Sequence, residues 1–202
     1  MRNLDRFRSL MLVAAAAALI ACGDIYAAAS LPQVAPPPPP PNRTPDVIFV
    51  PTRPAVVNAM LKLANVTKND VVYDLGCGDG AFIVAAGKLG ARAVGVDIDP
   101  QRVKEARANV EAAGLQKNVT VIHGDIFDPR LTISEASVVT LYLLPSLNVK
   151  LAPRLKQELK PGTRIVSNSF DMMQENPPWT PWPHDKTEVV DGYTNIYLWI
   201  IK

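Results

Sequence analysis

The sequence predicts an α/β fold with a doubly wound, mostly parallel sheet and an antiparallel hairpin at its C-terminal end. Three observations carry this prediction. From residue 46 onward, short apolar runs typical of buried strands alternate with stretches that have helical spacing. A glycine-rich segment, 76–80, follows the first apolar run. Asp191-Gly192 separates the last two runs, as a hairpin turn requires.

The first four elements follow from local spacing. A helix is expected over 54–65, because Pro54 suits the first helical turn and apolar residues then recur near helical spacing. The run over 71–75 (VVYDL) stops at glycines and predicts a strand. A helix over 81–89 and a second strand over 91–97 (ARAVGVD) are expected next.

The remaining elements are predicted from caps, stops and apolar runs. Asp99 is expected to cap a helix that begins at Pro100 and ends at Gly114. Leucines recur every fourth residue from Leu147 to Leu159 and predict a helix, which Pro153 is expected to kink or break. Strands are expected over 119–123, 137–144 and 164–167, and the closing hairpin over 187–190 and 194–201.

The charge distribution argues against a nucleic-acid-binding protein. The 202 residues include 21 basic and 19 acidic side chains, which gives a net charge of +2. Four basic and two acidic residues lie in 1–45, so residues 46–202 hold 17 of each sign and lack the basic excess that nucleic-acid partners favour. Two cysteines allow neither a disulfide scaffold nor a four-thiolate zinc site, and no metal-ligand cluster is expected.

Residues 1–30 are predicted to be a signal peptide or a membrane anchor. Three arginines, the last at Arg8, precede an uncharged run over 9–21. As a helix this run is roughly 20 Å long, too short for a ~30 Å hydrocarbon core, which favours a signal peptide. The alternatives are an uncleaved anchor and a mis-assigned start codon.

A possible lipidation site lies inside this leader. Leu19-Ile20-Ala21-Cys22 resembles the lipobox of bacterial lipoproteins, in which the cysteine is lipidated and becomes the new N-terminus. A rival cleavage site lies at Ala27-Ala28-Ala29. The expected location is therefore membrane-associated, as an exported lipoprotein if Cys22 is lipidated, with a cytoplasmic location as the alternative.

Residues 31–45 (LPQVAPPPPPPNRTP) are predicted to be a linker. They hold eight of the 19 prolines, six of them consecutive, and such a run adopts the extended polyproline II helix. This semi-rigid spacer would hold a domain over 46–202 away from a membrane surface. A proline-rich ligand for a partner domain is the alternative, for which the flanking residues carry no specificity signal.

A glycine-rich loop follows the first predicted strand, at the sheet edge where such folds bind ligands. Gly76, Gly78 and Gly80 let the backbone turn tightly and approach a ligand without interference from Cβ atoms. The helix after the loop points its positive N-terminal end at the same place, which favours a carboxylate or phosphate. Asp97 ends the second strand 21 residues after Gly76, where a carboxylate can accept hydrogen bonds from a ribose diol.

The carboxylates around this loop favour S-adenosylmethionine over a dinucleotide. The loop also fits the dinucleotide pattern G-x-G-x-x-A from Gly76 onward, but Asp74 and Asp79 would repel a pyrophosphate. Asp74 instead suits a ligand ammonium, and Asp125, at the end of the third strand, suits an adenine amino group. A turn with capping aspartates is the alternative without a ligand.

Three stretches of the sequence resemble class I S-adenosylmethionine-dependent methyltransferases. VVYDLGCGDG looks like their motif I, VGVDIDP like the acid that follows it, and HGDIFD like the adenine-side acid. The resemblance runs from about Val50 to Ser169 and implies a Rossmann-like sheet. More narrowly, Phe49-Val50-Pro51-Thr52 and the stretch LYLLPSLNVKLAPRLKQELKPGTRIVSNSF are similar to the protein-lysine methyltransferases that modify the c subunit of ATP synthase and the adenine nucleotide translocase. Those enzymes are attached to membranes through an N-terminal hydrophobic segment, which matches the leader here.

The resemblance implies cofactor contacts residue by residue. Asp74, Gly76, Gly78 and Gly80 would hold the methionine end, Asp97 the ribose, Asp125 and Ile126 the adenine, while Pro51 and Thr52 would cover the cofactor from the N-terminal side.

The residues after the fourth predicted strand would meet the methyl acceptor. They are Tyr142, Leu143, Leu144 and Pro145. They lack the Asn/Asp-Pro-Pro-Tyr/Phe motif with which amino-methylating enzymes grip a planar base or a glutamine amide. The resemblance makes a protein lysine the expected acceptor, and a small molecule or a lipid headgroup remains the alternative. Trp179, in a proline-rich loop, is a candidate wall of the acceptor channel or a packing residue.

No catalytic residue pair is expected. Methyl transfer is an in-line displacement that needs alignment and exclusion of water rather than covalent catalysis. A lysine amine must arrive neutral, and an apolar or aromatic channel lowers its pKa without a dedicated base.

Two other functions stay open, an NAD-dependent oxidoreductase and a non-catalytic surface lipoprotein with an inherited methyltransferase fold. Basic residues before the apolar run favour export of the C-terminal domain. Because S-adenosylmethionine is a cytosolic molecule, an exported domain would have little cofactor, which supports the non-catalytic lipoprotein.

Overall fold

The computed structural model describes residues 41, 43–173 and 180–202. The predicted leader over 1–30, with Cys22, lies outside this part, as do most of the predicted linker and Trp179. Among the described residues, no helix combines the length and the apolar character that crossing a membrane requires.

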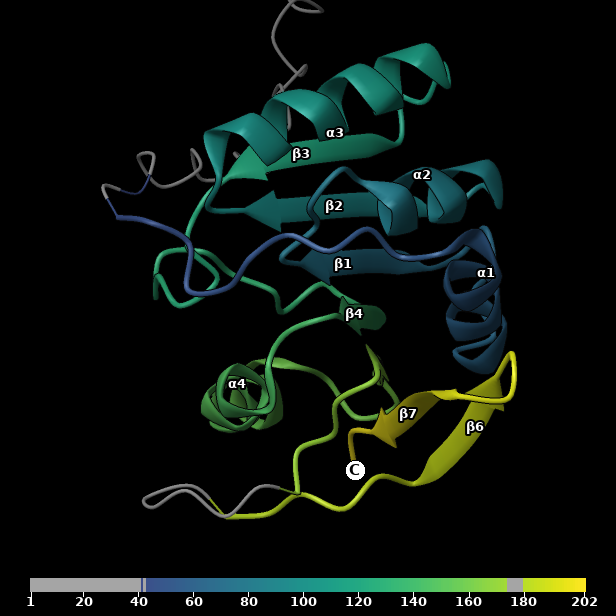
Figure 1. Cartoon of the computed structure of the whole chain (residues 1–202), viewed down its shortest axis with the longest axis vertical. Coiled ribbons are helices and arrows are strands. Elements are labelled where there is room, and N and C mark those ends of the chain that lie inside the picture. Colours follow the sequence, from purple (N-terminus) through teal and green to yellow (C-terminus); the bar gives the residue numbers. More distant parts are fainter. Residues whose placement is uncertain (1–40, 42, 174–179) are drawn as a thin grey trace, which may run out of the picture. The chain divides into compact units, whose positions relative to one another are not determined.

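One sheet forms the centre of the described domain (Figure 1). Its strands are β1 (Val71–Leu75), β2 (Arg92–Asp97), β3 (Val119–His123), β4 (Val138–Leu141), β5 (Arg164–Asn168), β6 (Lys186–Val190) and β7 (Thr194–Ile200). They are ordered β3-β2-β1-β4-β5-β7-β6. The first five strands of this order are parallel, whereas β7 is antiparallel to both β5 and β6. The predicted doubly wound, mostly parallel, Rossmann-like sheet with an antiparallel C-terminal hairpin is confirmed.

Both faces of the sheet are covered, because alternate strand residues point to opposite sides. The helices are α1 (Pro54–Leu63), α2 (Ala81–Lys88), α3 (Pro100–Ala112) and α4 (Pro145–Glu158). Helices α1, α2 and α3 share one apolar cluster with Val72 of β1. Helix α4 shares the opposite cluster with Tyr73 of β1, and the loop over 124–137 contributes Leu131 and Ile133 to it.

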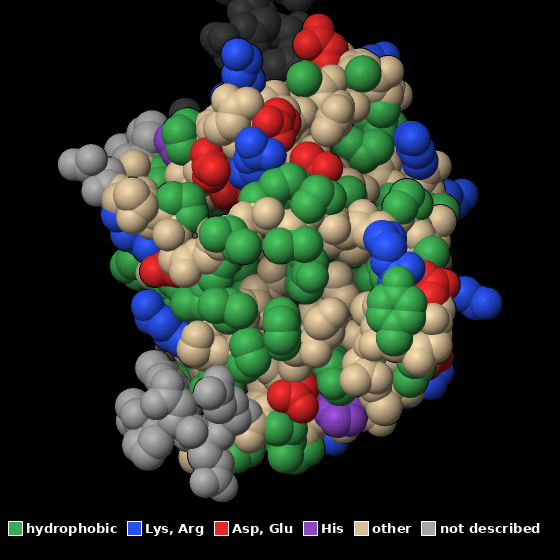
Figure 2. All heavy atoms as spheres, in the orientation of Figure 1, with side chains coloured by type: hydrophobic (Ala, Val, Ile, Leu, Met, Phe, Trp, Pro, Cys, Tyr) green, Lys and Arg blue, Asp and Glu red, His purple; other side chains and the backbone are tan. Residues whose placement is uncertain are grey.

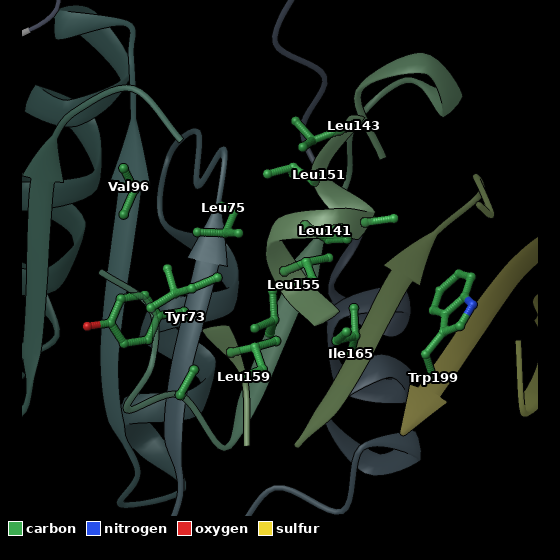
Figure 3. Close-up of a cluster of buried hydrophobic side chains, with 14 of the residues drawn as sticks. Tyr73, Leu75, Val96, Leu141, Leu143, Leu151, Leu155, Leu159, Ile165 and Trp199 are labelled. Atoms are coloured by element: carbon green, nitrogen blue, oxygen red, sulfur yellow. The ribbon is translucent and has the colours of Figure 1, made fainter. Parts of the chain in front are cut away.

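The second cluster holds α4 against the sheet. Figure 3 shows Leu151 and Leu155 of α4 beside Leu141 and Ile165 of the central strands, and all four side chains are fully buried. Burying a leucine or isoleucine side chain contributes about 1.5–3 kcal/mol. This cluster therefore fixes the start of α4 at the carboxyl ends of β4 and β5.

Helix α4 continues through Pro153, so the predicted break at this residue is wrong. Proline removes one backbone N–H from the helix, which leaves a carbonyl one turn earlier without its usual partner. The ring of Pro153 itself lies on the exposed side of α4. Leu151 and Leu155 hold the helix to the core on either side of it.

Strand β4 is shorter than the 137–144 range predicted from its apolar residues. Leu144 is the N-cap of α4 and Pro145 occupies the first helical turn, so the chain leaves the sheet after Leu141. Leu143 remains buried because it packs under the loop at Gly76. An apolar run alone does not distinguish a strand from the buried turn after it.

Replacing Leu155 with alanine should lower the free energy of unfolding by about 3 kcal/mol, because it removes fully buried methyl groups and leaves a cavity. Urea denaturation of the full chain, followed by circular dichroism, measures this difference. The exposed Gln157 of the same helix provides the control, and Gln157→Ala should change stability by less than about 0.5 kcal/mol. Equal losses in the two variants would contradict the core position of Leu155.

Candidate functional site

A pocket with a volume of about 510 Å³ lies at the carboxyl ends of β1, β2 and β4. Strand order reverses between β1 and β4, and ligands of open α/β sheets bind at such a switch point. In Figure 1 the carboxyl ends of β1, β2 and β3 point to the same edge of the sheet. The segment before α1, residues 43–52, supplies a further wall of the pocket.

The glycine loop forms the floor of this pocket. Gly76 has a φ of +87°, and a Cβ there would come within 2.9 Å of Cδ2 of Leu143. Gly78 has a φ of +53°, and a Cβ there would collide with the ring of Phe49. Gly76 and Gly78 both line the pocket, so their missing side chains leave its floor to backbone atoms.

Gly80, unlike Gly76 and Gly78, does not line the pocket. It is the N-cap of α2 with a φ of +85°. A Cβ at Gly80 would lie 3.1 Å from Cβ of Ala106 in α3. Its position is therefore explained by backbone conformation and helix packing.

Asp74, at the end of β1, presents an unpaired carboxylate oxygen in a residue that lines the pocket. Its side chain is 2% exposed. Oγ1 of Thr140 donates a hydrogen bond to Oδ1 over 2.7 Å, whereas Oδ2 has no partner among the described residues. Burial, helped by the nearby charge of Asp97, raises the pKa of Asp74 to about 8. An ammonium group of a ligand would satisfy Oδ2 and favour the ionised carboxylate.

Asp97 is held in the wall of the pocket by backbone amides. The N–H of Gly78 donates to its Oδ2 over 2.7 Å, and the N–H of Asp99 donates to its Oδ1 over 2.9 Å. Burial raises its pKa, although these amides act in the opposite direction. Each carboxylate oxygen keeps a second lone pair, so Asp97 can still accept hydrogen bonds from a ribose diol.

Asp125 and Ile126 also line the pocket, and Asp125 already has a strong partner. Nε and Nη2 of Arg43 donate to its two carboxylate oxygens over 2.8 and 3.0 Å. Burial acts to raise the pKa of Asp125, but the hydrogen bonds from Arg43 and from the amide of Phe127 leave it below its ordinary value. Asp125 therefore holds the segment before α1 in place, whatever else it binds.

Arg43 was not expected at this site, because it belongs to the predicted linker over 31–45. Its Nη1 also donates to Asp46 over 2.7 Å, so it joins the start of the segment to the third strand's end. Pro45 lies in the pocket wall as well. The only sequence signal for this role is a lone arginine in a linker whose other residues are uncharged.

Residues 43–52 carry exposed apolar side chains past the pocket. Ile48 is 86% exposed, and the guanidinium of Arg102 lies 4.7 Å from the ring centroid of Phe49. Figure 2 shows hydrophobic side chains gathered in the middle of the face drawn there. Thr52 lines the pocket, whereas its neighbour Pro51 does not.

The acceptor side of the pocket is aromatic and aliphatic. It is lined by Tyr142, Leu143, Leu144, Leu147 and Phe170. Pro145 begins α4 next to this wall without lining it, and Trp179 lies outside the described residues. Sequence reasoning missed Phe170, for which the available signal is its place just after the fifth strand.

A family model and a curated relative identify the family to which this chain belongs. The family model of the ANTKMT methyltransferase domain matches residues 74–180. A relative from Saccharolobus islandicus, named protein-lysine N-methyltransferase, is 44% identical over 161 residues, which cover 78% of this chain and 95% of that protein. The human lysine N-methyltransferase named for the c subunit of ATP synthase is 28% identical over 133 residues, which cover 66% of this chain and 54% of the human protein. The match thus spans about half the length of that human enzyme.

A solved structure gives the same fold with a bound product. The crystal structure of an RNA methyltransferase from Salinibacter ruber in complex with S-adenosyl-L-homocysteine is 48% identical to this chain. It superposes with a TM-score of 0.68 over 75% of this chain and 94% of that one. S-adenosylhomocysteine is the molecule that remains of S-adenosylmethionine after methyl transfer. The similarity therefore supports a methyltransferase over an NAD-dependent oxidoreductase or a protein without catalytic activity.

Replacing Asp74 with asparagine should weaken binding of S-adenosylhomocysteine by roughly tenfold to a hundredfold, because the ligand ammonium loses its charged partner. In the wild type the affinity should rise with pH up to about 8 and then level off. Below that pKa the carboxyl is protonated, and above it the carboxylate can pair with the ammonium. Isothermal titration calorimetry between about pH 6.5 and pH 8.5 measures both effects.

Asp74→Asn should also flatten the pH profile of binding, and it should raise the melting temperature at high pH by removing a buried charge. Asp185→Asn, in which the altered residue pairs with Lys202 away from the pocket, is the control and should keep the affinity and its pH profile. An Asp74→Asn variant with the wild-type profile would show that another group controls binding.

The residues present fit S-adenosylmethionine. The unpaired oxygen of Asp74 can bind its ammonium, and the carboxylate of Asp97 can bind its ribose hydroxyls. The loop at Gly76 and Gly78 lets the methionine part of the cofactor approach the backbone closely. The family match and the product-bound relative point to the same cofactor. The chain belongs to the ANTKMT methyltransferase domain family and is an S-adenosylmethionine-dependent methyltransferase.

Proposed function

We propose that this chain is a protein-lysine N-methyltransferase. The observation that carries the proposal is the apolar and aromatic wall beyond β4, where Tyr142, Leu144 and Phe170 line the pocket. A lysine side chain has a long aliphatic stem that packs on such a wall. The names of the relatives from Saccharolobus islandicus and human, both lysine N-methyltransferases, support the same acceptor.

The wall explains how a lysine can react without a dedicated base. A lysine ammonium has no lone pair, so it must lose its proton before it can attack. Apolar surroundings disfavour the charged form and lower the pKa of a lysine amine. Tyr142, Leu144 and Leu147 line the pocket and provide such surroundings.

S-adenosylmethionine supplies a methyl group attached to a positively charged sulfur. Held by Asp74 and Asp97, it would donate this methyl to the neutral lysine amine and leave as neutral S-adenosylhomocysteine. A methylated lysine would have to lose its proton to water before it could accept a further methyl. The chain's own contribution is to hold the donor through Asp74 and Asp97 and to exclude water with residues 43–52.

Cys77 does not offer a competing nucleophile. It is buried between the two loop glycines, and burial raises the pKa of its thiol well above the ordinary value. The nucleophilic form is the thiolate, so such a cysteine is unreactive. Its Sγ lies only 2.8 Å from where a Cβ on Gly95 would be, so Cys77 packs closely against β2.

The full chain, incubated with S-adenosylmethionine carrying a labelled methyl group and with protein extracts, should transfer the label to protein. A soluble extract and a detergent-solubilised membrane extract are compared, and acid hydrolysis should release labelled methyllysine. Extracts whose lysines have been blocked by acetylation should accept no label, because an amide nitrogen is not nucleophilic. Asp74→Asn is the matched variant and should transfer less label at the same cofactor concentration, because it weakens cofactor binding.

A third arm of the same assay contains total RNA, because the Salinibacter ruber relative bears the name RNA methyltransferase. The equal numbers of acidic and basic residues in 46–202 favour protein as the acceptor. Label in RNA, or only in small molecules that pass a filter, would overturn the lysine proposal.

We also propose that residues 1–30 attach the domain to a membrane. The basic start and the apolar run of the leader support this, and Cys22 is the candidate lipid carrier. Fractionation of cells that express the full chain should place it with membranes. Incorporation of a labelled lipid precursor should be lost in Cys22→Ser if Cys22 carries the lipid, and a soluble full chain would overturn the proposal.

A further inference from the structure

The turn after β5 is held in a strained conformation. Ser169 has a φ of +64°, a left-handed conformation that is unfavourable for residues other than glycine. The N–H of Phe170 donates to the carbonyl of Asn168 over 2.7 Å, which closes the turn tightly. Strained turns of this kind persist only where surrounding contacts hold them, and they are common next to functional sites.

A buried asparagine on α4 supplies the contacts that hold this turn. Asn148 is fully buried, and its Nδ2 donates to the carbonyl of Phe170 over 3.2 Å. The same Nδ2 lies 3.3 Å from Oγ of Ser167, which itself donates to the Phe170 carbonyl over 2.6 Å. The Phe170 carbonyl thus accepts hydrogen bonds from both side chains.

An asparagine at position 148 lowers the stability of the core relative to an apolar side chain. Its Oδ1 is buried and has no hydrogen-bond partner among the described residues. An unsatisfied buried acceptor costs stability, and an apolar side chain would avoid that cost. The amide is therefore better explained by the turn that it holds than by its contribution to folding.

The turn places the ring of Phe170 against Tyr142. The two rings are nearly parallel, with an angle of 20° and 6.3 Å between their centroids, and both line the acceptor side of the pocket. A methylene chain between two rings needs about 7 to 8 Å. The rings therefore form one continuous wall, and an acceptor side chain lies along it rather than between them.

We propose that the Tyr142–Phe170 wall receives the acceptor lysine and that Asn148 is a positioning residue, which sets the place of Phe170 through its backbone carbonyl. The inference rests on the proposed lysine methyltransferase function and adds the residues that align the acceptor. The aliphatic stem of a lysine packs on an aromatic wall of this kind. A displaced Phe170 misaligns the amine, so acceptor use suffers while cofactor binding does not.

The test compares Asn148→Ala, Phe170→Leu and the double variant in the full chain. The substrate is the detergent-solubilised membrane-protein extract, and total lysine methylation is measured against extract concentration. Each single variant should raise the half-saturating extract concentration, or lower turnover, by about tenfold. The dissociation constant of S-adenosylhomocysteine should stay within about twofold of the wild type in every variant, because Asn148 and Phe170 act on the acceptor side.

The double variant separates positioning from a general loss of packing. If Asn148 acts through Phe170, the double variant should be no worse than Phe170→Leu alone, whereas independent effects would multiply. Val149→Ala, which removes buried methyl groups from the same helix without touching these hydrogen bonds, should keep wild-type kinetics.

Three results would overturn the inference. They are multiplying effects in the double variant, unchanged acceptor kinetics in Asn148→Ala, and equal losses of cofactor and acceptor binding. A wild-type chain that binds S-adenosylhomocysteine but methylates no lysine overturns the proposed function and this inference with it. Lysine methylation by the wild type, with unaffected variants, overturns this inference alone.

Discussion

The buried carboxyl of Asp74 is the constraint on which the site depends. It stands at the end of the central strand β1 with one hydrogen bond, from Thr140, and with one oxygen left unpaired among the described residues. Its pKa is raised from 3.8 to about 8, so the folded state binds a proton that the unfolded state releases. Its contribution to stability therefore falls as the pH rises through this interval. A protein selected for stability alone would avoid such a group, whereas a cation-binding site requires it.

The rest of the pocket is arranged around that position. The glycine loop turns directly after β1, and its amide at Gly78 holds Asp97, so the two carboxylates keep a fixed relation. Leu143 supports the loop from below, because Gly76 leaves room for it. Leu143 in turn lies between β4 and α4, and the acceptor wall at Tyr142 belongs to the same short stretch. The short segment between β4 and α4 thus connects the cofactor side of the pocket with its acceptor side.

Local features of the sequence predicted the sheet and its ligand-binding edge, because strand ends, caps and glycine turns depend on a few neighbouring residues. Contacts between distant residues were beyond such reasoning. Arg43 reaches Asp125 across 82 positions, and Phe170 meets Tyr142 only because β4 and β5 pair. The predicted break at Pro153 was wrong for a related reason. Helix propensity predicts a break at proline, whereas tertiary packing holds the helix together. The missed residues are those whose role depends on the assembled sheet.

The ion pairs of Arg43 also determine where the chain enters the domain. A spacer that ended at residue 45 would join the domain at an arbitrary point of its surface. Because Arg43 is bound to Asp125 and to Asp46, the chain instead enters the domain at the pocket wall. The edge of the sheet that carries the pocket is therefore also the edge at which residues 43–46 join the domain.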